Sequence, residues 1–140
     1  MINDYMLVLS DAQAITNASA DSTYYIDTLA AGNAITPGAT FNVKINTACT
    51  TADGGTIIAT LSTGTSSDLS TGEVVLITAP TFRVVSAAAG SAKGVTIYRG
   101  VIPTGCLRYL WVTFTLANNL TAGAFDAYIN LDSDITIDGK

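Results

Sequence analysis

The chain has 140 residues, a length that predicts one domain over residues 1–140 with a core large enough to fold without disulfides. Its net charge of −5 and pI near 4.2 exclude the usual nucleic-acid binder, which needs a basic surface to neutralise phosphates. Charged residues make up only 12% of the chain and histidine is absent, so a coiled coil, a histidine base and a histidine zinc ligand are excluded.

The first third of the chain predicts short elements followed by one regular strand. Residues 6–9 are expected to form a terminal strand. Residues 12–20 are the only candidate for a short helix, although Thr, Asn and Ser weaken it. A weak strand candidate covers residues 24–29. Residues 39–48 alternate most regularly, and the side chains expected to be buried there are Phe41, Val43 and Ile45.

The remaining strands are predicted from the same alternation. Residues 107–117 place Leu110, Val112, Phe114 and Leu116 on one face with Arg108, and we expect both faces to be partly covered. Residues 124–131 repeat the pattern. The weaker candidates are residues 56–62, 73–78, 81–85, 95–101 and 135–137.

Turn residues separate these runs at short intervals. Pro37-Gly38, Asp53-Gly54-Gly55 and Pro103-Thr104-Gly105 are examples. About eight strands joined by such turns predict an all-β, single-domain β-sandwich or jelly roll.

Cys49 and Cys106 are 57 residues apart and do not form a CxxC motif. We expect both to be buried or edge thiols, and a disulfide between them is the alternative. No run of apolar residues is long enough to cross a membrane, and the acidic N-terminal segment lacks the pattern of a secretory signal, so we expect no membrane partner.

The sequence offers no convincing catalytic or metal site. It has no GxSxG motif, and neither cysteine has a histidine to activate it. Asp132, Asp134 and Asp138 resemble half of a calcium loop, but their spacing departs from the EF-hand pattern and favours an acidic tail. We expect no catalytic residues, no metal and no cofactor, and therefore no enzyme.

Aromatic residues are the more informative set. Large amphipathic rings are enriched at protein interfaces, and many outward strand positions here are uncharged Thr, Ser, Asn or Ala. The rings also suit two other roles, which are packing along the sandwich edges and a sugar-binding platform. The set comprises Tyr24, Tyr25, Tyr98, Tyr109, Trp111 and Tyr128.

Several segments, taken in order, resemble the capsid cement proteins of short-tailed bacteriophages. They are MINDYMLVLSDAQAIT at residues 1–16, Ser22-Thr23 before Tyr25-Ile26-Asp27, Leu107-Arg108-Tyr109-Leu110, and Leu120-Thr121-Ala122-Gly123-Ala124-Phe125. None of these motifs is catalytic, and their order and the chain length carry the likeness, which extends nearly end to end.

The resemblance implies a jelly-roll structural protein on the outer surface of an icosahedral virion head, made in the cytoplasm of the host bacterium. It implies binding to the major capsid protein, bridging of neighbouring subunits to stabilise the shell, and self-association as a homodimer in preference to a trimer. The sequence itself suggests an interaction arm over residues 1–20. The candidate interface residues are Tyr5, Met6, Leu7, Leu9, Tyr24 and Tyr25.

The alternative function is a carbohydrate-binding module or a receptor-binding head of the β-sandwich type. Exposed aromatic rings commonly bind sugars in such folds, and Trp111 is the residue on which this alternative depends.

Overall fold

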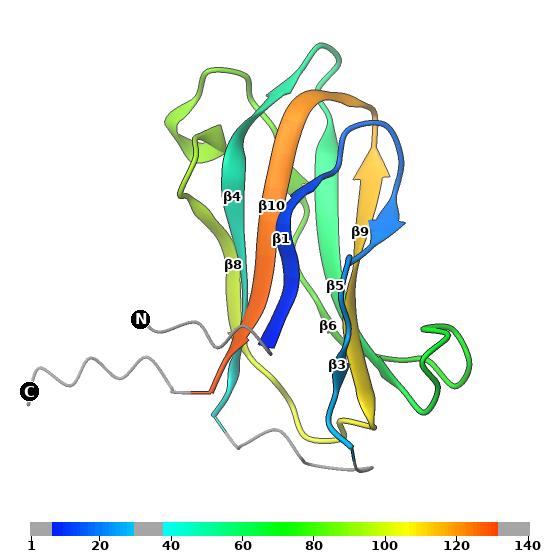
Figure 1. The fold of residues 1–140 in the computed structure, drawn as a ribbon. Helices are drawn as coiled ribbons and strands as arrows, with labels where there is room; N and C mark the ends of the chain where they lie inside the picture. Colours follow the sequence, from blue (N-terminus) through cyan, green and yellow to red (C-terminus); the bar gives the residue numbers. More distant parts are fainter. Residues whose placement is uncertain (1–6, 30–37, 132–140) are drawn as a thin grey trace, which may run out of the picture.

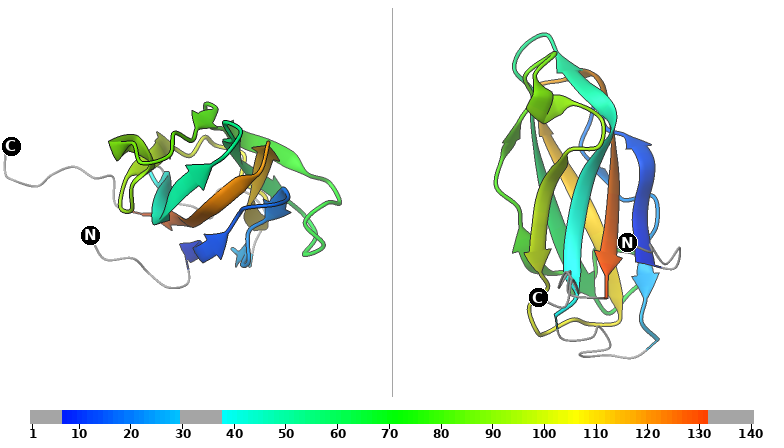
Figure 2. Two further views of the ribbon diagram at one scale, coloured as in Figure 1. Left: turned by 90° about the horizontal axis from the view of Figure 1, so that it is seen from above. Right: turned by 90° about the vertical axis from the view of Figure 1, so that its left-hand side faces the viewer.

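A computed structural model describes residues 7–29 and 38–131 of the chain, and these residues form two antiparallel sheets packed face to face (Figure 1, Figure 2). A single turn of 3₁₀ helix, η2 (Ala89–Ser91), interrupts the strands. The strands are β1 (Val8–Ala14), β2 (Ala20–Asp21), β3 (Ile26–Asp27), β4 (Thr40–Thr51), β5 (Thr56–Gly64), β6 (Val74–Thr78), β7 (Phe82–Arg83), β8 (Thr96–Val101), β9 (Tyr109–Ala117) and β10 (Leu120–Asn130).

The strand order is that of a jelly roll. One sheet, which we call sheet A, has the order β1-β10-β4-β8. The other, sheet B, has the order β2-β9-β5-β6, and in addition β3 pairs with β9 and β7 pairs with β5. If β2 with β3 and β6 with β7 are taken as interrupted strands, eight strand positions remain, as in a jelly roll. The predicted all-β sandwich of about eight strands is therefore confirmed.

The core lies between the inner faces of the two sheets. Phe41, Val43 and Ile45 of β4 are at most 1% exposed, as the alternation predicts. Across the core, Phe114 of β9 packs on Phe125 of β10 with ring centroids 5.8 Å apart. Burial of each such side chain contributes about 1.5 to 3 kcal/mol to folding. These residues hold the two sheets together and fix which faces point outward.

The predicted helix over residues 12–20 is wrong, because β1 occupies its first part. Ala14 pairs with Ala124, and the backbone N–H of Ile15 donates to the carbonyl of Gly123 at 3.2 Å. This pairing satisfies the backbone and buries Ile15 at 1% exposure, a gain that a helix of Thr, Asn and Ser could not match. The predicted strand over residues 135–137 lies outside the described residues.

Both cysteines are buried free thiols, as predicted. Burial raises the pKa of the Cys49 thiol to about 11, and burial also raises the pKa of Cys106. No helix of the described residues is long and apolar enough to cross a membrane.

Candidate functional site

One lateral edge of the sandwich is closed by the segment between β2 and β3. The N–H of Ser22 donates to the carbonyl of Val112 on β9 at 2.7 Å, and the N–H of Tyr24 donates to the carbonyl of Leu9 on β1 at 2.9 Å. The segment therefore bonds to sheet B through Ser22 and to sheet A through Tyr24. This attachment fixes the backbone on which Tyr24 and Tyr25 stand, at 44% and 46% exposure.

Tyr25 does not stand alone on this edge. Its ring meets the ring of Tyr109 edge to face, with centroids 5.6 Å apart and planes at 73°. The guanidinium carbon of Arg108 lies 5.0 Å from the centroid of the Tyr109 ring, within cation–π range. Tyr109 therefore holds Tyr25 and Arg108 together at the start of β9.

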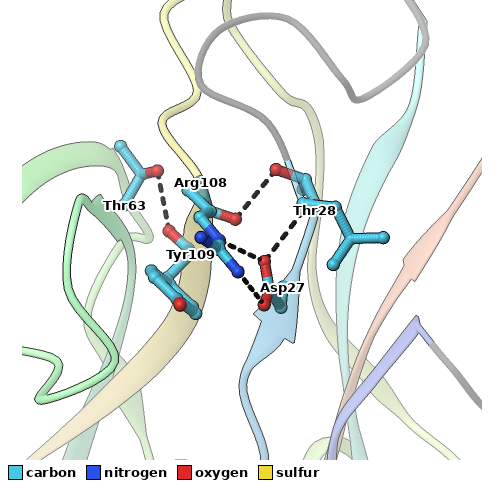
Figure 3. A network of polar contacts seen from close by, with 6 residues as sticks. Asp27, Thr28, Thr63, Arg108 and Tyr109 are labelled. Carbon is cyan, nitrogen blue, oxygen red and sulfur yellow. Dashed lines mark hydrogen bonds and ion pairs between the residues drawn. The ribbon is translucent and has the colours of Figure 1, made fainter.

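A network of hydrogen bonds and one ion pair, which we call the polar clamp, holds Arg108 and Tyr109 in place (Figure 3). Arg108 donates from Nε to Oδ1 of Asp27 at 2.8 Å and from a terminal nitrogen to Oδ2 at 2.9 Å. The backbone N–H and the hydroxyl of Thr28 both donate to the carbonyl of Arg108 at 2.8 Å. On the other side, the hydroxyl of Thr63 donates to the carbonyl of Tyr109 at 2.8 Å. The clamp joins β3, β5 and β9 at one end of the sandwich.

The ion pair changes the titration of both partners. The hydrogen bonds from Arg108, helped by the backbone N–H of Leu29, hold the pKa of Asp27 below its usual 3.8. The Asp27 carboxylate in turn raises the pKa of Arg108. Both groups are therefore charged at neutral pH, and the clamp persists across the physiological range.

Leu29 ends the described part of this edge in an unusual conformation. Its φ is 64°, in the left-handed region that favours glycine and asparagine, and its side chain is 78% exposed. Its N–H donates to Oδ1 of Asp27 at 2.8 Å, which keeps the backbone in place. We use the name tyrosine edge for Tyr24, Tyr25, Leu29 and Tyr109.

The structure divides the interface residues expected from the sequence. Tyr24 and Tyr25 lie exposed on the tyrosine edge, whereas Leu9 is completely buried in the core and Leu7 packs partly against it. Leu9 is thus unavailable to a partner of the folded protein. Tyr5 and Met6 lie outside the described residues.

The expected interaction arm over residues 1–20 is part of the sandwich from Val8 onward. Residues Val8–Ala14 form β1, which pairs with β10 along its length. The pairing explains the early apolar run at the N-terminus, because Leu9 and Ile15 supply core side chains. Of residues 1–20, those before Leu7 lie outside the described residues.

Trp111 is not the exposed platform that a sugar-binding alternative would need. It points to the outer face of sheet B, yet it is 1% exposed, because the segment 65–73 between β5 and β6 folds over it. Glu73 fastens the end of this segment by accepting the hydroxyl hydrogen of Ser62 at 2.8 Å. The expectation that both faces of this strand are partly covered is confirmed.

Within residues 7–29 and 38–131, no group of three or more Cys, Asp or Glu side chains is placed to hold a metal ion. The acidic residues Asp132, Asp134 and Asp138 lie outside that part of the chain.

Sequence reasoning missed three members of this site. Leu29 and the Asp27–Arg108 pair were not proposed, although Arg108 stood out as a charge on the apolar side of a strand. Its partner lies 81 residues away, so only the fold brings the two together. Tyr109 belonged to the aromatic set without a role of its own.

A family model described as Bbp16 matches residues 9–129, which run from β1 to the end of β10. A comparison with curated proteins gave no match. The family match spans most of the chain and nearly all of the described fold. The chain therefore belongs to the Bbp16 family, a membership that suggests a bacteriophage protein.

Proposed function

We propose that this protein is a capsid cement protein that binds the outer surface of an icosahedral phage head and bridges neighbouring major capsid subunits. The observation that carries the proposal is the tyrosine edge, a rigid and exposed aromatic surface in a chain whose family suggests a phage origin. Such a surface suits a protein partner, because tyrosines bury much area with little loss of side-chain freedom.

The clamp behind the tyrosine edge favours binding. Asp27 and Arg108 hold Tyr109 and, through it, Tyr25 in one arrangement before any partner arrives. Surfaces ordered in advance lose less conformational entropy on association. Each protein that touches two shell subunits gains further, since its second contact forms within an existing complex.

Self-association as a homodimer is part of the proposal, and strand β6 is the surface we favour for it. Among the described residues β6 pairs only with β5, so its other edge presents backbone N–H and C=O groups. Val74 and Val75 on this strand are 48% and 53% exposed, and β6 contains no charged residue. An apolar edge strand without charges pairs readily with a second strand.

The direct test is binding to phage heads that lack the protein. We expect Tyr24→Ser/Tyr25→Ser to fold normally and to bind heads at least tenfold more weakly than the wild type, as judged by cosedimentation. Thr96→Ser, on the exposed surface of β8, is the matched control and should bind normally. Wild-type binding by the double variant would remove the tyrosine edge from the proposal, and no binding by the wild type would reject the cement function.

A second variant tests the dimer separately. Val75→Lys places a charge on the β6 edge, and we expect sedimentation equilibrium to show a shift from dimer to monomer. A wild type that is monomeric at every concentration would reject self-association. A dimer unaffected by Val75→Lys would place the contact elsewhere.

A further inference from the structure

The outer face of sheet B carries a hollow of about 400 Å³ that none of the preceding roles uses. Its floor is formed by β5 and β9, and its wall by the segment 65–73, the green loop beside β9 in Figure 1. The volume lies in the range of small-molecule sites. The lining residues are Asp21, Thr60, Leu69, Ser70, Glu73, Trp111, Thr113 and Thr115.

The wall of the hollow is held in shape by its own hydrogen bonds. Oδ1 of Asp68 accepts the backbone N–H groups of Ser70 at 3.0 Å and Thr71 at 2.8 Å, and Oδ2 accepts the Thr71 hydroxyl at 2.6 Å. At the end of β5, the missing side chain of Gly64 leaves room for the Trp111 ring and for the carbonyl oxygen of Thr71 in the segment. The hollow is therefore formed before any ligand binds.

Two carboxylates flank the hollow, and each has one oxygen engaged. Oδ1 of Asp21 accepts the Thr113 hydroxyl at 2.6 Å, and Oε1 of Glu73 accepts the Ser62 hydroxyl at 2.8 Å. Within the described part of the chain, neither carboxylate forms an ion pair, and the second oxygen of each accepts no hydrogen bond. Asp21 and Glu73 thus each retain one carboxylate oxygen that can accept a hydrogen bond from a ligand.

The spacing of these acceptors indicates the size of the ligand. Thr113 pairs with Thr60, so Thr113 and Ser62 are diagonal neighbours on adjacent strands. Such neighbours lie about 7 to 8 Å apart, and Asp21 on β2 and Glu73 beside β6 approach them from opposite sides of the β9–β5 pair. A ligand that reaches both must be extended and must donate hydrogen bonds at both ends.

The rest of the lining is hydroxyl-bearing or apolar. Thr60 and Thr115 have hydroxyls with no hydrogen-bond partner in the described residues, and they can donate or accept. Leu69 adds partly exposed apolar surface beside them, and the Trp111 ring lies buried beneath at 1% exposure. This combination suits a molecule with many hydroxyl groups and an apolar face of C–H groups. We propose that the hollow binds a neutral saccharide of about two sugar rings.

This site differs from the exposed aromatic platform that the sequence suggested. The specificity of the site comes from the carboxylates of Asp21 and Glu73 and from the threonine hydroxyls. The Trp111 indole lies buried beneath the hollow. The proposal is independent of head binding, because it is tested on the free protein.

The test uses Trp111, the one tryptophan of the chain, as a fluorescent reporter together with amide NMR shifts. The probes are maltose, lactose and the disaccharide of N-acetylglucosamine, with arginine amide as a cationic comparison. We expect at least one disaccharide to give saturable changes at segment 65–73 and at the Trp111 indole. Thr60→Val and Glu73→Gln should each weaken that binding about tenfold.

Thr96→Val on β8 is the matched control, because it removes an exposed threonine hydroxyl from the other sheet. Its affinity should equal that of the wild type, and the melting temperatures of all variants report whether they fold. The proposal is overturned if none of the three disaccharides saturates, or if binding survives both Thr60→Val and Glu73→Gln. Saturable binding of arginine amide without any sugar binding also overturns it and assigns the hollow to a cation.

Discussion

The Asp27 carboxylate and the Arg108 guanidinium form a two-point ion pair, with N···O distances of 2.8 and 2.9 Å, although 81 residues separate them in the chain. The planar guanidinium matches both carboxylate oxygens, a geometry that lysine cannot reproduce. The pair joins β3 to the residue preceding β9. It thereby positions Tyr109 for its edge-to-face contact with the ring of Tyr25. The arrangement of the side chains on the tyrosine edge therefore depends on the neighbouring Asp27–Arg108 ion pair.

The first prediction concerns the pH dependence of this pair. Because the folded-state pKa of Asp27 lies below 3.8, its ionised form stabilises the fold above that pH, and this stabilisation is lost as pH falls through the folded-state value. We expect Asp27→Asn to be less stable than the wild type in urea at neutral pH. The difference should shrink progressively as the pH falls below 3.8.

Asp53→Asn is the control for this comparison, since Asp53 is an exposed turn residue without an ion pair in the described structure. It should show no such convergence. A wild type and an Asp27→Asn variant with equal stability at neutral pH would show that the pair contributes nothing to folding.

The second prediction concerns Leu29, whose φ of 64° is unfavourable for a leucine. Asparagine tolerates this region, so Leu29→Asn should stabilise the protein by up to about 1 kcal/mol, measured by thermal or urea unfolding. The same change removes an exposed apolar side chain from the tyrosine edge and should weaken head binding. A variant that gains stability and loses binding would show that the strain serves interaction.

Leu29→Ala provides the control, because alanine removes the side chain without relieving the backbone. It should weaken binding without gaining stability. Loss of stability in Leu29→Asn would contradict the strain argument.

Sequence reasoning recovered the sandwich because most strands have one buried face. The alternation at Phe41, Val43 and Ile45 gave both the strand and its orientation, and all three are in the core. It failed at residues 12–20, where pairing with β10 decides the conformation and local propensity does not. It also overestimated residues 24–29, where only Ile26 and Asp27 pair with β9.

The candidate sites were harder to predict for a physical reason. Tyr24 and Tyr25 were expected at the surface from their residue type, and they are 44% and 46% exposed; their role in an interface stays a prediction. The roles of Leu29 and Trp111 depend on backbone conformation and on what covers the side chain, and neither is encoded by a local pattern. The hollow is likewise assembled from β2, β5, β9 and segment 65–73, which meet only in the folded protein.

The third prediction tests how closely Gly64, at the end of β5, packs against the Trp111 ring. A Cβ atom at Gly64 would lie 3.0 Å from the Cη2 atom of Trp111, closer than ordinary contact. Gly64→Ala should therefore destabilise the protein by about 1 to 3 kcal/mol and shift the Trp111 fluorescence toward that of an exposed indole. Gly90→Ala is the control, because its Cβ would meet no atom within 4 Å. Equal stability of the two variants would mean that Gly64 does not pack closely against the indole.

The fourth prediction concerns the two buried thiols. Cys49 is 1% exposed and Cys106 is 3% exposed, and burial raises the pKa of Cys49 to about 11. Since the thiolate is the reactive form, both cysteines should resist a disulfide-exchange reagent near pH 8 in the native protein and react fully once it is unfolded. A reducing agent should leave the melting temperature unchanged, because the two thiols are not bridged.

The raised pKa of Cys49 also predicts how the stability of the protein changes in alkali. The thiol of Cys49 ionises near the usual pKa of 9.0 in the unfolded chain and stays neutral until about 11 in the folded state, so ionisation stabilises the unfolded form between these pH values. The wild type should lose stability over this range, measured by urea unfolding at successive pH values. Cys49→Ala, which has no thiol at this position, should decline less steeply from pH 9 to 11. Parallel declines for both proteins, or rapid labelling of Cys49 in the native state, would show that its thiol is accessible to water.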